Sequence, residues 1–529
     1  MSIEDDPTSM ADFGFAGTFE YDEGTTMIDA PGEFPDPASL DLKAVVYFPA
    51  DAAGATNPGQ LSDAEDEYPM VVVVHGNSLS LLSYQGYDYL LEHLARNGMI
   101  AASIHVYPGA QGVSRARALF KHLEILGAKF GDRIDWERLG IMGHSRGGEA
   151  VVIASKLNVD EGLGYEFGAI VSLAPTDQYG PYSLAGPYAV PYLVIYGGLD
   201  GDVIGASPKS TGFSLYDRAD PVKSMIFAER ACHDRFNTQW DDNDFFFGHM
   251  TAADQAAVIS ADAHEKIVKG YMNGFFRWRL FDDDGMRDFF TGDERPRQVE
   301  QADGGTVQID VQYQEPGGLT LDRFASGAWN VNDLGGVVSA TLPAVPGKGD
   351  LNALDGYSPH DHTGGLLRWD AARHIYVSNL PAASQDVSDY DLLSFRVTQR
   401  YGSTSDPVGM PQDFFVMLTD QDGRSRGVPV SLFAALNYPY VRGITNLTKS
   451  AMKTVRIPLS EYTRELVGVE PIELDELASV GFELTVDPAG EIEVTDIEFV
   501  SDGEDDEDDE DDDEDDDDED EEEEEEEGD

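Results

Sequence analysis

A serine flanked by glycines lies at a predicted strand-to-helix corner. The apolar run 139–142 leads directly into the motif GHSRGG (residues 143–148), and a helical pattern follows. A Gly-x-Ser-x-Gly corner lifts the serine hydroxyl above the sheet, and its glycines leave room for the turn and for the helix to pack. The helix N-terminus beneath the serine favours developing negative charge. Ser145 is therefore predicted to be a nucleophile, the alternative being a chance Gly/Ser turn.

The elements around this serine alternate between strand-like and helical patterns. Segments 87–98 and 115–130 carry apolar residues at helical spacing, as does the segment after the corner, and 262–281 forms a last amphipathic helix. Four consecutive valines, 71–74, suit a parallel strand buried on both faces. Alternation of this kind predicts an α/β sheet. The expected strands are 43–48, 70–75, 99–106, 139–142, 168–173, 192–196 and 223–227.

The first half of the chain resembles the α/β-hydrolase superfamily. The GHSRGG form looks like that of chlorophyllases, and the layout is similar to dienelactone hydrolases, platelet-activating-factor acetylhydrolases and cutinase-like polyester hydrolases. The resemblance covers roughly residues 40 to 282, about half the chain. It implies a Ser-Asp-His triad in that chain order and an oxyanion hole shared between a strand-end loop and the residue after the nucleophile.

The sequence offers residues for each implied role. His233 follows the last predicted strand, in "ERACHDRF", and is the expected base. The stretch "YLVIYGGLDGDV" offers Asp200 and Asp202 as the acid that holds the imidazole, and its Gly-x-x-Asp spacing favours Asp200, although both also suit a simple turn. The backbone N–H groups of Asn77 and Arg146 are the expected oxyanion donors.

Other polar residues near these positions have simpler interpretations. His75 and His144 are expected to be structural, and His249 and His264 are weaker candidates for the base. The Arg146 side chain could touch a substrate or pair with Glu149 or another acid. The aromatic residues of the loops 173–188 and 240–249 could line an acyl pocket or simply anchor these loops on the fold. The sequence leaves both interpretations open.

The second half of the chain shows a different sequence pattern. Short alternating segments from 299 to 500, beginning with "GTVQIDVQY", predict an all-β sandwich and resemble galactose-binding-like jelly rolls. The expected organisation is an acidic N-terminal segment 1–40 compatible with an edge strand at 17–21, a hydrolase domain 41–285, the sandwich 299–500 and a disordered acidic tail 501–529. "HDH" (360–362) and "DQDG" (420–423) are interpreted as turns, so neither a metal nor a cofactor is expected.

The formal net charge is −65 and has two sources. Residues 504–527 are uninterrupted Asp and Glu, and the acidic residues outside the tail still outnumber Lys plus Arg. Such charge opposes compaction unless salt screens it, so the chain resembles proteins of extreme halophiles. Nucleic acid is excluded as an expected partner, because its binding depends on neutralising phosphates with Lys and Arg.

Targeting features point to no membrane span. The start of the chain shows neither a charged n-region nor an apolar h-region, and no stretch reaches ~18 uninterrupted apolar residues. One cysteine, Cys232, allows no internal disulfide. A cytoplasmic location is the expectation.

The leading hypothesis is a halophilic serine hydrolase that cleaves small or polymeric carboxylic esters through an acyl-enzyme. The sandwich would bind a carbohydrate or polymer, or only pack structurally. Two alternatives remain open: a peptidase with the same triad, and a carbohydrate- or surface-binding protein whose first domain is a scaffold without activity.

Overall fold

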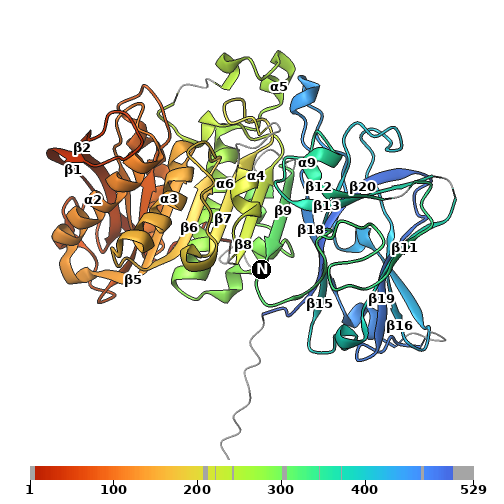
Figure 1. Cartoon of the computed structure of the whole chain (residues 1–529). Coiled ribbons are helices and arrows are strands. Elements are labelled where there is room, and N and C mark those ends of the chain that lie inside the picture. Colours follow the sequence, from red (N-terminus) through yellow and green to blue (C-terminus); the bar gives the residue numbers. More distant parts are fainter. Residues whose placement is uncertain are drawn as a thin grey trace, which may run out of the picture.

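The computed structural model describes residues 6–205, 212–220, 222–240, 244–300, 307–344, 346–370, 372–465 and 470–503. Figure 1 shows a mixed α/β part, in red to green, beside an all-β part in green to blue. The predicted mixed α/β class is confirmed, and the all-β C-terminal part is compatible with the predicted sandwich.

The α/β part is built on one nine-stranded sheet with the order β1-β2-β4-β3-β5-β6-β7-β8-β9. Strands β4, β3, β5, β6, β7 and β8 run parallel, whereas β1 and β2 at one edge and β9 at the other are antiparallel to their neighbours. The strands are β1 Phe15–Ile28, β2 Ala38–Ala50, β3 Tyr68–Val74, β4 Ile100–Ile104, β5 Ile134–His144, β6 Phe167–Leu173, β7 Tyr192–Gly197, β8 Lys223–Ala228 and β9 Ile309–Gln314.

Helices cover both faces of this sheet. Helices α1 and α6 share one apolar core with Val71 and Val73, while α2, α3 and α4 share the other with Val72 and Val74. Successive residues of the run 71–74 therefore face opposite cores in turn, which explains why all four positions are occupied by apolar side chains. The helices are α1 Asp88–Arg96, α2 Gly112–Phe130, α3 Arg146–Glu161, α4 Gly212–Asp217, α5 Ala252–Ala257, α6 Ala261–Leu280, α7 Asp288–Thr291 and α8 Arg297–Glu300.

The all-β part consists of two antiparallel sheets that enclose a third core. One sheet has the order β12-β13-β20-β15-β18, with β10 also paired to β20, and the other has the order β11-β14-β19-β16-β17. The strands are β10 Leu319–Asp322, β11 Val338–Ala340, β12 Gly347–Asp350, β13 Thr363–Trp369, β14 His374–Asn379, β15 Leu392–Gln399, β16 Phe415–Asp420, β17 Ser425–Pro429, β18 Lys453–Pro458, β19 Leu477–Leu484 and β20 Gly490–Val500. Two short helices, α9 Leu351–Leu354 and α10 Ser460–Thr463, accompany them.

One segment lies in a different sheet from the one expected. "GTVQIDVQY" (305–313) was assigned by its alternation to the sandwich, but β9 pairs antiparallel with β8 and completes the first sheet. Strand β8 would otherwise present an unpaired edge, which proteins tend to cover. The chain thus returns to the α/β sheet before it enters the sandwich.

A buried charge network joins the two parts. Arg396 of β15 pairs with Asp217 of α4 and with Asp496 of β20, each at 2.8 Å. His360 Nδ1 lies 3.2 Å from Asp217, and His362 Nε2 lies 3.1 Å from Asp496. The HDH motif, interpreted from sequence as a turn, therefore supplies partners for buried carboxylates.

The two ends of the chain differ in what the structure describes. The predicted edge strand at 17–21 lies within β1, paired to β2. Of the predicted acidic tail 501–529, residues 504–529 lie outside the described residues, but Asp502 pairs with Arg287 of the α/β part and with Arg456 of the sandwich. None of the helices in the described ranges has the length and apolarity needed to span a membrane.

Candidate active site

Ser145 occupies a strained corner between β5 and α3. Its backbone has φ 59° and ψ −122°, a positive φ that only a few non-glycine residues of this chain adopt. The Ser145 N–H donates to Leu173 O at 2.9 Å, which ties the corner to the neighbouring strand β6. The side chain is thereby held at the carboxyl end of the parallel strands, where open α/β sheets bind ligands.

The glycines of the motif are required by close backbone contacts. A Cβ at Gly143 would lie 1.9 Å from Gly147 O, and one at Gly147 would lie 2.0 Å from Val74 O. A Cβ at Gly76, after β3, would lie 2.6 Å from Ser145 Cβ. The serine corner and the end of β3 therefore pack so closely that larger residues are excluded from both.

His233 and Asp200 form a buried pair beside this corner. His233 Nδ1 lies 2.7 Å from Asp200 Oδ2, and both side chains are almost completely buried. The other oxygen of Asp200 accepts N–H bonds from Asp202 at 2.9 Å and from Val203 at 2.7 Å. In the neutral imidazole, Nδ1 therefore carries the proton, because the carboxylate accepts, and Nε2 keeps a free lone pair.

Asp202 lies on the other side of the imidazole. Its Oδ2 is 3.8 Å from His233 Nε2, and its side chain is about a third exposed. The structure thus gives the two aspartates different places: Asp200 orients the ring through Nδ1, while Asp202 faces the nitrogen that would exchange protons with a substrate.

The electrostatic environment favours a protonated imidazole. Burial by itself lowers the pKa of His233, but Asp200, followed by Asp202 and Asp244, more than offsets this, so the pKa lies above its ordinary value of 6.5. Burial raises the pKa of Asp200, and the neighbouring His233 opposes that rise. The carboxylate therefore stabilises the imidazolium that a general base forms.

Asp244 connects the loops that carry the acid and the base, and sequence reasoning did not single it out. It accepts N–H bonds from His233 and Asp234 at 2.7 Å and from Gly201 at 2.8 Å. Its side chain is buried, so these three donors satisfy a desolvated carboxylate. One aspartate within the acid-rich loop 240–249 carries no sequence signal that would distinguish this role.

The two predicted oxyanion donors lie on either side of the serine corner. Arg146 is the first residue of α3, so its N–H belongs to the N-terminal amides that have no partner within the helix. Asn77 follows β3 and Gly76, and its side-chain oxygen accepts the N–H of Gly109 at 2.8 Å, which fixes the loop. In the ranges that the structure covers, no protein acceptor is present for the Asn77 N–H.

Trp240 packs against the serine–histidine region. Its ring stacks on His144 with centroids 4.7 Å apart and lies 6.1 Å from the His233 ring, and its Nε1 donates to Ser83 Oγ at 2.9 Å. Within the described part of the chain, His233 Nε2 has no hydrogen-bond partner, so Ser145 Oγ does not hydrogen-bond to it. Catalytic hydrogen bonds of this kind are often loose without substrate.

A cleft of about 530 Å³ opens next to these residues. Asn77 and Asp202 form part of its wall, and Trp240 and Phe247 supply apolar surface. From the segment 240–249, Trp240 and Phe247 therefore line the cleft, while Asp244 anchors the site. The described residues of 173–188 do not line this cleft.

The remaining histidines and Glu149 have other partners. Val106 N donates to His75 Nε2, Tyr87 OH contacts His144 Nδ1, and His264 Nε2 accepts from Cys232 N. His249 Nδ1 lies 2.8 Å from Gly201 O. Glu149 accepts bonds from Thr176, Gln178 and Tyr179 in the segment after β6 and does not pair with Arg146.

The sandwich also reaches this site through Arg442. Its guanidinium donates to the backbone oxygens of Asp200 at 3.0 Å, Gly198 at 3.3 Å and His249 at 2.9 Å. Sequence reasoning did not identify it, because Arg442 lies 242 residues from Asp200. The loop that carries the acid is thus held from both domains.

Comparison with known proteins yields no assignment of its own. No protein-family model matches the chain, and no curated protein sequence is significantly similar to it. Among the residues that the structure describes, no group of three or more His, Cys, Asp or Glu side chains is arranged to hold a metal ion.

Proposed function

We propose that the chain is a serine hydrolase of the α/β-hydrolase fold that cleaves carboxylic esters. The strand order β1-β2-β4-β3-β5-β6-β7-β8, with an antiparallel edge and a serine corner after β5, supports this fold assignment. The two-sheet sandwich that follows is consistent with a jelly-roll accessory domain.

One observation carries the proposal. Ser145 lies at a positive-φ corner after β5, and the ring of His233, which Asp200 contacts at 2.7 Å, lies 4.7 Å from the ring of the neighbouring His144; the chain order is Ser, Asp, His. Nε2 of His233 is left free on the side away from Asp200. This arrangement has the parts that nucleophilic catalysis requires: a nucleophile, a base and a group that orients the base.

In the first half-reaction, Ser145 Oγ attacks the ester carbonyl carbon while its proton moves to His233 Nε2. Negative charge then develops on the carbonyl oxygen, and the N–H groups of Asn77 and Arg146 stabilise it. Collapse of this intermediate breaks the bond to the alcohol oxygen. The alcohol leaves with the proton from Nε2, and the acyl group remains on Ser145.

In the second half-reaction, water replaces the alcohol. His233 Nε2 accepts a proton from the water as its oxygen attacks the acyl carbon, and returns that proton to Ser145 Oγ when the acid is released. Asp200 stabilises the imidazolium in both halves without itself taking the proton.

The cleft favours an ester with an apolar part. Trp240, Leu79 and Phe247 offer apolar wall, and Leu79 and Phe247 are well exposed. Asp202 and Asp234 add negative charge to the wall of the cleft, so an anionic substrate would be repelled. An uncharged acyl ester fits this lining best.

The test uses a fluorophosphonate probe and a panel of nitrophenyl esters of increasing chain length, assayed in molar salt. We expect one equivalent of probe on Ser145, located by peptide mass analysis, and loss of ester turnover in proportion to labelling. Aminoacyl anilides in the same panel test for a peptidase. Absence of both labelling and turnover in a cooperatively folded sample would reject the proposal.

A further inference from the structure

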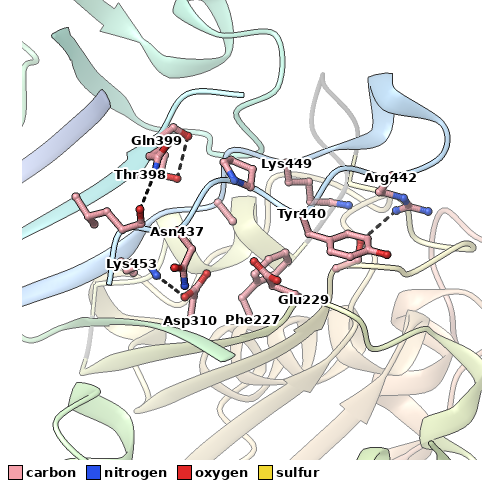
Figure 2. Close-up of a pocket in the computed structure, with 14 residues that line it drawn as sticks. Phe227, Glu229, Asp310, Thr398, Gln399, Asn437, Tyr440, Arg442, Lys449 and Lys453 are labelled. Carbon is pink, nitrogen blue, oxygen red and sulfur yellow. Dashed lines mark hydrogen bonds and ion pairs between the residues drawn. The ribbon is translucent and has the colours of Figure 1, made fainter. Parts of the chain in front are cut away.

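A small cavity lies where the two parts of the molecule meet (Figure 2). Gly198, Phe227 and Glu229 contribute from the ends of β7 and β8, and Asp310 contributes from β9. The facing wall comes from the sandwich and consists of Thr398, Gln399 and residues between Leu436 and Lys453. The centre of a water-sized sphere can move through about 20 Å³ of it. That is more than the ~10–15 Å³ that one water requires, so the cavity has room for a water or a single-atom ion.

Two cationic side chains in this wall each have a nitrogen without a hydrogen-bond acceptor in the described part of the chain. Lys449 is 6% exposed and its Nζ has no hydrogen-bond partner; the Tyr196 ring centroid lies 5.6 Å from it. Arg442 is 1% exposed, and its Nε also has no partner, although its terminal nitrogens bond three backbone oxygens. In Figure 2 the Lys449 side chain extends toward Arg442. Within the described ranges, no carboxylate forms an ion pair with either of them.

The nearby acidic residues do not supply the missing negative charge. Asp310 pairs with Lys453. Burial, and then repulsion from Asp310, raises the pKa of Glu229 to about 8, so this carboxyl is neutral at pH 7. Asp200 is already bonded to His233. The right-hand side of the cavity in Figure 2 therefore holds two buried cationic side chains without an ion pair among the described residues, and the carboxylates that act on Arg442 (Asp200, Asp254 and Asp244) do not line the cavity.

A neutral lysine would not resolve this imbalance. Burial lowers the pKa of Lys449, and repulsion from Arg442 lowers it further, while Asp200 opposes the change. Loss of the lysine proton would remove one charge, but a guanidinium does not deprotonate in proteins, so Arg442 would stay charged with an unsatisfied Nε–H. A buried charge without a counter-charge is costly, and an anion beside both groups would satisfy the charge and both donors.

We propose that the interdomain cavity is a binding site for a small monovalent anion, with chloride as the simplest occupant, held between Lys449 Nζ and Arg442 Nε. The small free volume excludes phosphate and sulfate in favour of a single-atom ion. Because Arg442 also bonds the backbone of Asp200, the anion would stabilise the contact between the sandwich and the acid loop. This proposal does not depend on the hydrolase assignment.

The first test is thermal melting at constant ionic strength, with chloride replacing gluconate, which is too large for the cavity. We expect the Tm of the wild-type chain to rise with chloride and to saturate, by about 2 °C or more. The rise should shrink at high pH, because anion binding favours the protonated form of Lys449.

Two lysine variants separate a specific site from general salt effects. Lys449→Met should remove the chloride-dependent part of the Tm while retaining the general salt dependence. The control is Lys223→Met, which also removes a buried lysine, but one whose Nζ already bonds Tyr216 O and Ala219 O. It should retain the chloride response.

A second measurement needs no variant. Crystals of the wild-type chain grown or soaked in bromide should show an anomalous peak within hydrogen-bond distance of Lys449 Nζ and Arg442 Nε. Equal Tm in chloride and gluconate together with no bromide peak would overturn the proposal, and water would then be the occupant. A chloride response that persists unchanged in Lys449→Met would also overturn it.

Discussion

Two buried charge clusters in this molecule differ in whether all of their polar atoms have partners. In the interdomain network, Arg396, Asp217 and Asp496 meet at 2.8 Å, and His360 and His362 close the remaining sides. In the candidate site, Asp200 and His233 are equally buried, but Nε2 of His233 has no hydrogen-bond partner among the described residues, and Asp202 lies 3.8 Å from it. A cluster whose role is structural satisfies its charges, whereas one that performs chemistry must leave an atom available for substrate.

The largest expected effect of any single change is that of removing the proposed nucleophile. Ser145→Ala should lower kcat for ester hydrolysis by about 10⁵-fold or more, because nucleophile and base act as a unit. Its Tm should stay within ~1 °C of wild type, since alanine keeps the backbone of the corner. Steady-state assays and thermal melting measure the two quantities. Ser155→Ala, on the same helix and bonded to Tyr188 O, is the control and should retain activity.

The acid that orients the base should come next. Asp200→Asn should lower kcat by ~10⁴-fold, because an amide at this position can hold His233 in the wrong tautomer. Asp202→Asn should have a much milder effect, since Asp202 lies 3.8 Å from Nε2 and does not bond Nδ1. Steady-state ester hydrolysis by both variants is the measurement. The reverse ranking would transfer the orienting role to Asp202.

Part of this site could be predicted from the sequence because local patterns determine it. The glycines around Ser145 are required because a Cβ at Gly143 or Gly147 would lie about 2 Å from a backbone oxygen, so the motif itself carries the geometry. Gly197 and Gly198 turn the chain after β7, and a Cβ at either would meet the backbone of the segment after β8. The α/β class of the first part could be predicted from apolar runs such as 71–74, which suit a parallel strand buried on both faces.

The rest depended on long-range contacts that no local pattern reports. An alternating strand looks the same in either sheet, so β9 could not be assigned to the first one from its sequence. Asp244 is one of 100 acidic residues, and its three backbone donors come from two other loops. Arg442 and the HDH motif act across the domain boundary, where sequence spacing carries no information about contact.

The interdomain network should respond in stability rather than in chemistry. Arg396→Met would leave Asp217 and Asp496 buried without their shared guanidinium, which costs about 3–5 kcal/mol in comparable sites. Urea unfolding in molar salt measures the loss, and kcat of the folded fraction should be little changed. Arg373→Met, which removes the exposed pair with Glu483, should leave the free energy of unfolding almost unchanged, because solvent screens such pairs. Equal losses in the two variants would contradict the role of the buried network.

The pH dependence should reveal the environment of His233. Hydrolysis needs neutral Nε2, so kcat/KM should rise about tenfold per pH unit and level off only above pH 6.5, since Asp200, Asp202 and Asp244 raise the pKa of this histidine. Asp202→Asn keeps Nδ1 oriented and should move the midpoint to lower pH. His144, whose ring centroid lies 4.7 Å away, is kept neutral because burial lowers its pKa well below 6.5.

The same shift has a definite sign for stability. A folded pKa above the unfolded value means that the folded state binds the proton more tightly, so this contribution is fully present below about pH 6.5 and is lost as pH rises through the folded pKa. A pH-rate profile and a series of melts give the two readouts. A midpoint below 6.5 in wild type would contradict the assigned environment.

The smallest effect is expected from truncating the end of the chain. Asp502 forms a third and more exposed charge cluster there, and the two truncations below differ in whether they keep it. Asp502 is 40% exposed and contacts Arg287 and Arg456, one from each part of the molecule. A chain ending at Gly503 keeps these pairs and loses only the continuous acidic run, so its Tm in molar salt should match that of the full chain. A chain ending at Ser501 also loses the pairs, and because half-exposed pairs contribute about 0–1 kcal/mol each, its Tm should fall by a degree or two at most. Melting of the two truncations, with ester turnover as the control for folding, measures the difference. A large drop in Tm for the chain ending at Gly503 would show that residues 504–529 stabilise the fold. A large drop in Tm only for the chain ending at Ser501 would show that Asp502 contributes to stability as the buried network does.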